Sequence, residues 1–490
     1  MKFVRTKKQG KTSIKLNFIM NAVLSLSSVI FPLVTFPYAS RVLQPEGIGK
    51  VSFAASFMSY FCMFAQLGIP TYGVRACAKV RDDKRKLTKV AQELLWINMI
   101  MSILSYIVLA GVLLTVPKFK TDKILYIMVS MTIILNAIGM EWLYRALEQY
   151  TYITIRSVVF KAVALVLMFF LIHESDDYIL YGGITIFAAS ASNILNFINA
   201  HNYIGMKPLK NYDFRRHLKP IVIFFAMSCA TTIYTNLDTV MLGFMKTNAD
   251  VGLYNAAVKI KSVLVSIVTS LGAVLLPRAS YYVEKGMIEE FREVSKKAIN
   301  FVFLIATPLM IYFIIYARPC VLFLSGEAYL GAVRPMQIIM PTLLFIGLSN
   351  LLGIQMLIPM GKEKIVLYSE IIGAVVDLGL NAVLIPVYAA TGAAIGTVVA
   401  ELAVLIVQYV ALKWEVNDII KKIHYFSISF GIVLASIISY QVVKLELSSF
   451  MTLFITSIVF WGIYGVILFI MKEEMLMQFY GEIRKRYLKK

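Results

Sequence analysis

The sequence predicts an all-α polytopic membrane protein with about fourteen transmembrane helices, and two observations support this fold class. Hydrophobic residues make up 59% of the 490 residues and charged residues 16%, against roughly 45–50% and about 25% in soluble globular chains. A soluble fold has too little interior to bury this much apolar surface, so part of the solvent must be lipid. The second observation is a regular series of long apolar runs along the whole chain.

Each apolar run reaches the roughly 17–25 residues that a helix needs to cross the hydrocarbon core of a bilayer. In chain order the expected helices are 16–39, 49–72, 90–116, 124–147, 154–172, 179–199, 219–244, 252–277, 298–317, 336–358, 364–387, 390–412, 424–443 and 449–471. The first run is too long for the apolar core of a signal peptide, so we expect it to remain as the first helix. An even number of helices places both termini on one side.

The formal net charge of +20 is distributed unevenly between alternate loops. With the N-terminus placed in the cytoplasm, 36 of the 48 Lys and Arg residues fall in cytoplasmic segments and 9 in external loops. Basic residues are retained on the cytoplasmic side of multi-pass proteins. The sequence therefore predicts two cytoplasmic termini, and the positive charge is interpreted as an orientation signal and a contact for anionic membrane lipids, with no nucleic acid as partner.

Several classes of function are excluded or disfavoured by missing motifs. The four cysteines and four histidines form neither a CxxC motif nor a ligand cluster, so no disulfide framework, metal site or resident cofactor is expected. No GxxxxGK[ST] motif is present, which excludes an ATP motor on this chain. A membrane glycosyltransferase or polymerase generally needs a large external loop with acidic residues, and the external loops here are short. A transporter is therefore favoured over an enzyme.

Polar residues recur at helical spacing within several of the apolar runs. Such stripes indicate a hydrated cavity, because each polar side chain costs free energy when it faces lipid. Small residues also allow helices to pack closely, so helix packing remains an alternative for the hydroxyl and glycine positions. The stripes are Asn17, Asn21, Ser25, Ser28, Pro32 and Thr35; Ser52, Ser56, Ser59 and Gln66; Ser228, Thr231, Thr235 and Asp238; Lys259, Ser262, Ser266 and Thr269; Glu370, Gly373, Asp377 and Asn381; and Thr397, Glu401 and Gln408.

The charged residues in and beside these spans are mostly basic. Asp238 and Lys259 are expected at similar depth, at ~1.5 Å of rise per residue, which predicts a salt bridge between them. Glu141 and Arg145 are spaced i,i+4, and a structural ion pair is the alternative to a role in the cavity. The expected substrate cavity contains Arg41, Arg145, Lys161, Asp238, Lys259, Asn21, Ser25 and Ser266.

Two further features suggest how transport is gated and driven. Pro32 and Pro37 each remove a backbone hydrogen bond from the first helix, which predicts a kink and a gate or hinge. Because the chain has no nucleotide motif, the expected energy source is a Na⁺ or H⁺ gradient, the membrane potential or downstream consumption of the product. The in-span carboxylates of the second half that are proposed to bind the cation are Asp377, Glu401 and Glu370.

A weak internal repeat predicts the domain organisation. The segment 47–55 is similar to 250–257, and 181–184 is similar to 391–395, with offsets of about six helices. Two parallel six-helix lobes related by an axis along the membrane normal would produce such a repeat. We therefore expect an N-lobe over 1–205, a C-lobe over 206–415, and two additional helices with a basic cytoplasmic tail over 416–490.

Six segments also resemble a known family. They are PYASRVLQPEGIGKVSFAASFMSYFCMFAQLGIPTYGVRACAKVRDD (37–83), EWLYRALEQYTYITIRSVVFKA (141–162), YTNLDTVMLG (234–243), VGLYNAAVKI (251–260), LLPRASYY (275–282) and IQMLIPMGKEK (354–364). These segments are similar to those of bacterial Wzx-type flippases, which are related to the teichoic-acid and lipid II flippases. All belong to the multidrug/oligosaccharidyl-lipid/polysaccharide (MOP) superfamily.

The resemblance implies a transporter of two pseudo-symmetric six-helix bundles around a central cavity, in a bacterial cytoplasmic membrane. Such proteins move a polyprenyl-pyrophosphate-linked oligosaccharide to the outer leaflet by alternating access. It also implies partnership with the polysaccharide polymerase and glycosyltransferases of the same pathway. An ion-coupled exporter of drugs with the same fold remains the alternative. The basic residues argue against that alternative, because exported drugs are usually cations and would favour an acidic cavity.

Overall fold

The computed structural model describes residues 14–421, 423 and 425–487, and these residues form helices and connecting turns without a strand. Contacts divide the chain into two compact units. The first unit runs to Leu43 and resumes over Lys50–Asn236, and the second comprises Gln44–Gly49 and the residues from Leu237 onward. The predicted lobe boundaries at 205/206 and 415/416 remain predictions.

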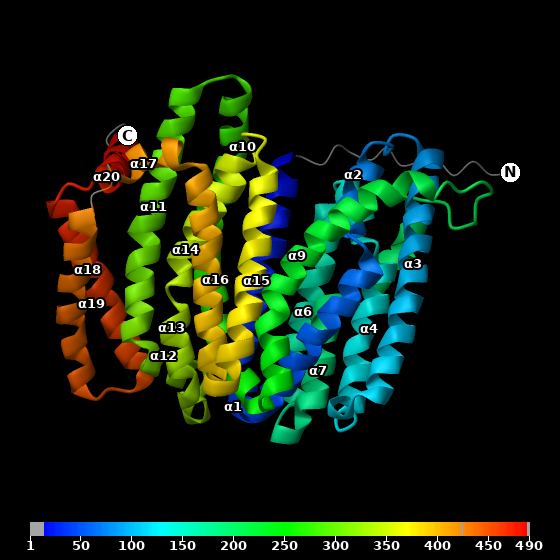
Figure 1. Ribbon diagram of the computed structural model, residues 1–490, viewed down its shortest axis with the longest axis horizontal. Coiled ribbons are helices and arrows are strands. Elements are labelled where there is room, and N and C mark those ends of the chain that lie inside the picture. Colours follow the sequence, from blue (N-terminus) through cyan, green and yellow to red (C-terminus); the bar gives the residue numbers. More distant parts are fainter. Residues whose placement is uncertain (1–13, 422, 424, 488–490) are drawn as a thin grey trace. The chain divides into compact units, whose positions relative to one another are not determined.

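In the described part of the first unit, from Ile14 onward, nine α-helices lie in whole or in part, connected by short 3-10 and π turns (Figure 1). In chain order its elements are α1 (Ile14–Gln66, without Gln44–Gly49), α2 (Ile69–Ala78), α3 (Lys84–Thr115), η1 (Pro117–Phe119), α4 (Lys123–Gly139), α5 (Glu141–Ala146), α6 (Tyr150–Leu171), η2 (Ser175–Asp177), α7 (Tyr178–Ile186), η3 (Phe187–Ala191), α8 (Asn193–Asn199), η4 (Ala200–Asn202) and α9 (Arg215–Met245, as far as Asn236). Within this unit α4 packs against α3, α7 and α8, and α2 packs against α5.

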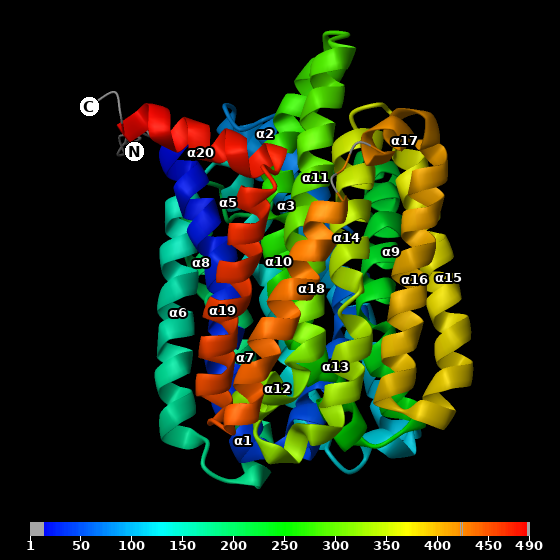
Figure 2. The same ribbon diagram turned by 90° about the vertical axis from the view of Figure 1, so that its left-hand side faces the viewer.

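The second unit takes up the end of α9 and continues to the last described helix. Its further elements are α10 (Asn248–Glu284), α11 (Ile288–Ile315), α12 (Ala317–Ser325), η5 (Glu327–Ala332), α13 (Val333–Ile339), α14 (Thr342–Asn350), η6 (Leu351–Leu357), α15 (Glu363–Tyr388), α16 (Ala390–Ala411), α17 (Lys413–Lys421), α18 (Tyr425–Tyr440), η7 (Gln441–Leu445), α19 (Ser449–Ile470) and α20 (Glu474–Tyr487). The pairs α15–α16 and α18–α19 each pack side by side (Figure 2).

The apolar helices confirm the predicted fold class. In the described residues, twelve helices are long and apolar enough to cross a membrane, and a thirteenth is formed if Glu327–Ile339 and Thr342–Leu357, bent by 46°, count as one span. The first of these, Leu16–Ala78, is 63 residues long and covers two predicted runs. Gln44 has a φ of 58° within α1 and separates these runs. The chain is therefore a multi-pass membrane protein, and the predicted number of about fourteen helices is roughly consistent with these spans.

A buried network fixes the start of α9 to α3 in the first unit. Glu93 of α3 is fully buried and accepts hydrogen bonds from the backbone N–H of Asp213 (2.7 Å), from Arg216 and from Nε2 of His217 (2.8 Å). The hydroxyl of Tyr72, on α2, lies 2.8 Å from Nδ1 of the same histidine. The carboxylate is therefore compensated by several donors, and it ties the connector after α8 to the packed helices.

Candidate functional site

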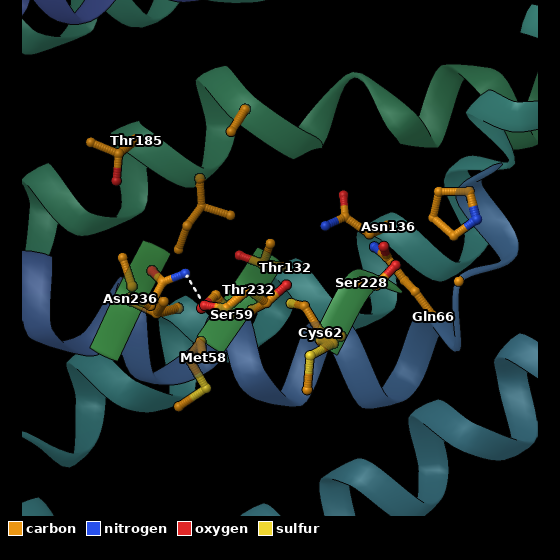
Figure 3. A pocket seen from close by; sticks show the side chains of 17 residues that line it. Met58, Ser59, Cys62, Gln66, Thr132, Asn136, Thr185, Ser228, Thr232 and Asn236 are labelled. Atoms are coloured by element: carbon orange, nitrogen blue, oxygen red, sulfur yellow. Dashed lines mark hydrogen bonds between the residues drawn. The ribbon is translucent and has the colours of Figure 1, made fainter. Parts of the chain in front are cut away.

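A polar cavity of about 500 Å³ lies within the first unit. Its walls come from the second half of α1, the turn into α2, α4, α7 with η3, and α9. The lining residues are Ala55, Met58, Ser59, Cys62, Met63, Gln66, Gly68, Pro70, Val129, Thr132, Asn136, Thr185, Ile186, Ala189, Ser228, Thr232 and Asn236 (Figure 3).

The polar groups of this cavity are hydroxyls and carboxamides, and no lining residue carries a formal charge. Hydroxyls and amides both donate and accept hydrogen bonds, whereas the methionine and isoleucine side chains between them offer apolar contact. A neutral wall of this kind suits a ligand rich in hydroxyl groups. It contains no carboxylate that would attract a cationic ligand.

A glycine allows α9 to approach this cavity closely. Gly68 adopts a φ of +71° in the turn between α1 and α2, and an added Cβ would lie 2.5 Å from backbone atoms of Phe224 and Phe225. Any side chain here would push α9 away from the turn. The close approach brings Ser228, Thr232 and Asn236 of α9 opposite α1, and Asn236 is oriented by donating to the carbonyl of Thr232 at 3.0 Å.

The polar stripes predicted from the sequence contain some of the residues that line this cavity. Ser59, Gln66 and Ser228 belong to predicted stripes and line it. Thr132, Asn136 and Thr185 were missed because the runs that carry them show no comparable polar stripe. Thr232 and Asn236 were missed because they widen the polar face of α9 beyond the predicted positions. The excess of uncharged polar residues around the α9 stripe is the signal that could have identified Thr232 and Asn236.

The predicted basic residues of the first unit lie outside the cavity lining. Lys161 of α6 is half-buried and donates from Nζ to the hydroxyls of Ser27 (2.9 Å) and Ser28 (2.8 Å) on α1. Arg145 forms the predicted ion pair with Glu141, with 2.7 Å between Nη2 and Oε1. Arg41 is exposed on α1, as are the predicted cavity residues Asn21 and Ser25.

The predicted salt bridge between Asp238 and Lys259 is wrong for the described structure. The carboxylate of Asp238 accepts hydrogen bonds from Asn381 (2.6 Å) and from the hydroxyl of Tyr254, and the Thr397 hydroxyl lies 2.9 Å from it. All three partners are neutral and come from other helices of the second unit. Lys259 is exposed on α10, and so is Ser266, whose hydroxyl donates to the carbonyl of Ser262. Neutral donors therefore take the place of the expected ammonium group.

Two buried oxygen atoms beside this cluster have no hydrogen-bond partner among the described residues. They are Oδ1 of Asp377 and Oδ1 of Asn381, both on α15. A Cβ added at Gly396 of α16 would lie 3.1 Å and 2.4 Å from them, so both oxygens point towards the same glycine. Asp238, Lys261 and Glu401 are close enough for their charges to act on Asp377. Acceptor oxygens with no donor are arranged to take up a proton or a hard cation.

The remaining predicted residues lie as follows. Glu401 is buried on α16, and Glu370 is half-buried two turns before Asp377 on α15. No group of three or more His, Cys, Asp or Glu side chains in the described part of the chain is arranged to hold a metal ion. Pro32 and Pro37 lie in helical backbone, and the non-helical residue recorded within α1 is Gln44. The gate or hinge at these prolines stays a prediction.

Solved structures share this fold. "Lipid II flippase MurJ, inward closed conformation" matches with a TM-score of 0.72 and 15% identity, over 93% of this chain and 100% of that chain. "Inward-facing conformation of a multidrug resistance MATE family transporter of the MOP superfamily" matches with a TM-score of 0.62 and 16% identity, over 83% and 99%. The chain is thus a multi-pass membrane protein with the fold of the MOP superfamily.

The sequence comparisons then identify the family. The family model described as polysaccharide biosynthesis protein matches residues 14–283, and the MatE model matches residues 223–383. A "Putative O-antigen transporter" of Escherichia coli (strain K12) is 27% identical over 365 residues, which are 72% of this chain and 86% of the relative. A protein of the same description from Shigella dysenteriae is 24% identical over 429 residues, covering 81% and 100%. The chain belongs to the polysaccharide biosynthesis protein family, which confirms the resemblance that the sequence segments indicated.

Proposed function

We propose that this protein is a flippase that moves a polyprenyl-pyrophosphate-linked oligosaccharide from the cytoplasmic to the outer leaflet by alternating access. The repeat unit would be of the capsule, O-antigen or teichoic-acid type. The observation that carries the proposal is the cavity of hydroxyls and carboxamides in a chain of this family. Sugars are bound in proteins mainly through such groups, whereas the polyprenyl tail is apolar enough to stay in the lipid.

The pyrophosphate needs positive charge along the same path. Lys161 is the best supported candidate, because its ammonium group is half-buried and bonded only to serine hydroxyls in the described structure. A phosphate oxygen that replaced these neutral acceptors would form a stronger, charge-assisted hydrogen bond. Arg41, Arg145 and Lys259 are exposed and are the further candidates.

The energy for transport is proposed to come from a cation gradient. The oxygens of Asp377 and Asn381 that lack partners support this proposal, because a proton or Na⁺ bound there would satisfy both atoms. Glu401 and Glu370 are the accessory carboxylates. If Asp377 carries the coupling cation, Asp377→Asn should abolish the response of reconstituted flipping to imposed proton or sodium gradients, whereas Glu370→Gln should reduce it less.

The proposed cellular setting follows from the same function. The protein would lie in a bacterial cytoplasmic membrane with both termini inside, because lipid-linked repeat units are assembled on the cytoplasmic leaflet. Glycosyltransferases would supply its substrate and a polysaccharide polymerase would consume its product. Anionic membrane lipids would contact the basic cytoplasmic loops.

A second candidate function is an ion-coupled exporter of drugs or other small molecules. The match of the MatE model to residues 223–383 favours it. The cavity lining argues against it, because cationic drugs would be held by a carboxylate and none lines the cavity. A membrane glycosyltransferase or polymerase has no supporting observation.

One experiment separates these functions. In a strain lacking the gene, lipid-linked repeat units should accumulate on the cytoplasmic leaflet, where they stay protected from a membrane-impermeant periodate or lectin probe. Expression of the wild-type chain should restore their exposure. Unchanged exposure in the deletion strain, together with increased sensitivity to cationic drugs, would support the exporter instead.

A further inference from the structure

The inference concerns a buried arginine that does not contact the cavity. Arg156 of α6 is 6% exposed. Its Nη1 donates to the hydroxyl of Ser192 (2.6 Å) and to Oδ1 of Asn193 (3.1 Å), and its Nη2 lies 3.5 Å from Oε2 of Glu141. A guanidinium group has donors and no acceptor. The side-chain amide of Asn193 must therefore turn its oxygen towards Arg156.

The orientation of Asn193 fixes that of a second amide. With its oxygen facing Arg156, Asn193 presents Nδ2 to α4 and donates to Oδ1 of Asn136 at 3.1 Å. The hydroxyl of Ser190 donates to the same oxygen at 3.2 Å. The oxygen of Asn136 is thus held by two donors, and its amide nitrogen is left on the other side.

Asn136 is a lining residue of the cavity. In Figure 3 its oxygen and nitrogen point in different directions, with the oxygen towards the ribbon of the segment that carries Thr185. The nitrogen makes no recorded hydrogen bond within the described residues. Arg156 therefore fixes the orientation of both amides. As a result, Asn136 presents a hydrogen-bond donor to the cavity rather than an acceptor.

The local backbone is shaped for this chain of contacts. Ser190 lies in η3, a π-helical turn, and Asn193 begins α8 after the single intervening residue Ser192. Such π turns occur often at functional sites, since they change the direction of side chains along a helix. Gly139 of α4 faces Asn193, and an added Cβ would lie 2.5 Å from its Cγ. The space for the Asn193 amide therefore depends on a glycine.

We propose that Arg156 and Asn193 are positioning residues that turn the N–H groups of Asn136 into the cavity to bind an acceptor oxygen of the ligand. The oxygen belongs to a sugar hydroxyl or to the pyrophosphate. This inference rests on the proposed flippase function for the identity of the ligand. The orientation of the amides rests only on the contacts above.

The decisive substitution is Asn193→Asp. A carboxylate keeps the partner of Arg156 but has no N–H to donate, so the amide of Asn136 reverses and presents its oxygen to the cavity. The substitution changes none of the residues that line the cavity, only the orientation of the Asn136 amide. A matched control is Asn199→Asp on the same helix, because Oδ1 of Asn199 already accepts a hydrogen bond from Asn202, and Asn199 is not among the residues bonded to Asn136.

The measurement is binding of a polyprenyl-pyrophosphate-linked disaccharide to the full-length protein in detergent. Asn193→Asp should weaken binding about tenfold, the effect of one lost hydrogen bond to a ligand, and Asn199→Asp should bind as wild type does. Arg156→Lys should retain most of the affinity, whereas Arg156→Met, which has no N–H to donate to Asn193, should reproduce the loss. In an Asn136→Ala background, Asn193→Asp should have no further effect.

A second probe, polyprenyl pyrophosphate without sugar, identifies the acceptor oxygen. Equal weakening for both probes assigns it to the pyrophosphate, and weakening only for the glycosylated probe assigns it to the sugar. Wild-type affinity of Asn193→Asp, or the same tenfold loss in the Asn136→Ala background, would overturn the inference.

A measurement without ligand tests the positioning role of Asn193 separately from the flippase function. The effects of Asn193→Asp and Asn136→Ala on the melting temperature should be non-additive in the double variant, because the two residues share one hydrogen bond. Additive effects would overturn the positioning role even if the protein bound neither probe. Failure of the wild-type protein to bind either probe, with non-additive melting, would instead contradict the flippase function alone.

Discussion

At the scale of single residues, two carboxylates of the second unit differ in what surrounds their oxygens. Asp238 is buried and its oxygens contact Asn381, Tyr254 and Thr397, whereas Oδ1 of Asp377 has no hydrogen-bond partner among the described residues. Asp238 of α9 therefore connects its own helix to three others, α10, α15 and α16. Asp377 keeps one acceptor oxygen to which no donor of the described residues is bonded.

This contrast predicts opposite effects on stability. Asp238→Ala should leave at least two buried donors unsatisfied, at about 1–3 kcal/mol each, and should lower the melting temperature in detergent. Asp377→Asn is the matched control and should melt at or above the wild-type temperature, because it removes a buried carboxylate without removing a hydrogen bond to Oδ1. Equal destabilisation by the two substitutions would contradict the separate roles.

Lys161 gives a second prediction at this scale. Lys161→Gln should reduce flipping of the lipid-linked oligosaccharide by about tenfold or more, since a neutral amide cannot form a charge-assisted bond with pyrophosphate. Lys161→Arg should restore part of the rate, because Lys acts as a point charge and Arg keeps the charge with another geometry. Both variants should reach wild-type abundance in the membrane. Full activity of the Gln variant would reduce Lys161 to a packing contact with Ser27 and Ser28.

At the scale of helices, the sequence predicted where apolar segments lie better than where they break. Two separate spans were expected at 16–39 and 49–72, and α1 consists of two helices that meet at a kink, where Gln44 is the non-helical residue. Pro32 and Pro37 drew attention because proline removes a backbone donor, yet the backbone around them is helical. A positive φ at Gln44 has no signature in composition, because glutamine is an ordinary helix former.

Gly68 provides a prediction about one element approaching another. Gly68→Ala should destabilise the protein by about 1–2 kcal/mol from the left-handed backbone alone, and more from the contact with Phe224. The substitution should also separate α9 from the turn after α1 and weaken ligand binding in the cavity. Gly111→Ala is the control, because an added Cβ there meets nothing within 4 Å. Comparable melting temperatures for the two variants would contradict the close approach.

The start of α3 gives a pH-dependent prediction outside the membrane spans. The backbone N–H groups of Lys86 and Arg85 donate to Asp83, which holds the pKa of this carboxyl below its usual value of 3.8. A lowered pKa means that the cap is complete above pH 4 and is lost as the pH falls through the folded-state pKa. Amide exchange at the first turn of α3 should therefore increase as the pH falls below the folded-state pKa of Asp83. Asp83→Asn, which caps without titrating, should show no such increase.

At the scale of the whole molecule, composition and charge predicted the class, and the family models confirm it. The basic residues were expected in the cavity, but the cavity found within the first unit is lined by neutral groups from helices far apart in sequence. Isolated residues such as Thr132 and Thr185 acquire their role only when α4, α7 and α9 pack together. No spacing within one helix contains that information. The repeat likewise predicts two lobes but not the side chains that each lobe encloses.

The membrane topology is the last prediction, and it concerns the chain as a whole. The 36-to-9 distribution of basic residues predicts that the segment 75–89 lies in the cytoplasm and the turn at 173–177 outside. Asp176 and Lys84 are both exposed, so a cysteine at either position can react with a reagent that does not cross membranes. In a background where the four natural cysteines are replaced by serine, Asp176→Cys should be labelled in intact cells. Lys84→Cys should be labelled only after the membrane is opened. The reverse pattern would invert every loop, and it would place Lys86 and its basic neighbours away from the anionic cytoplasmic leaflet that their charge is expected to contact.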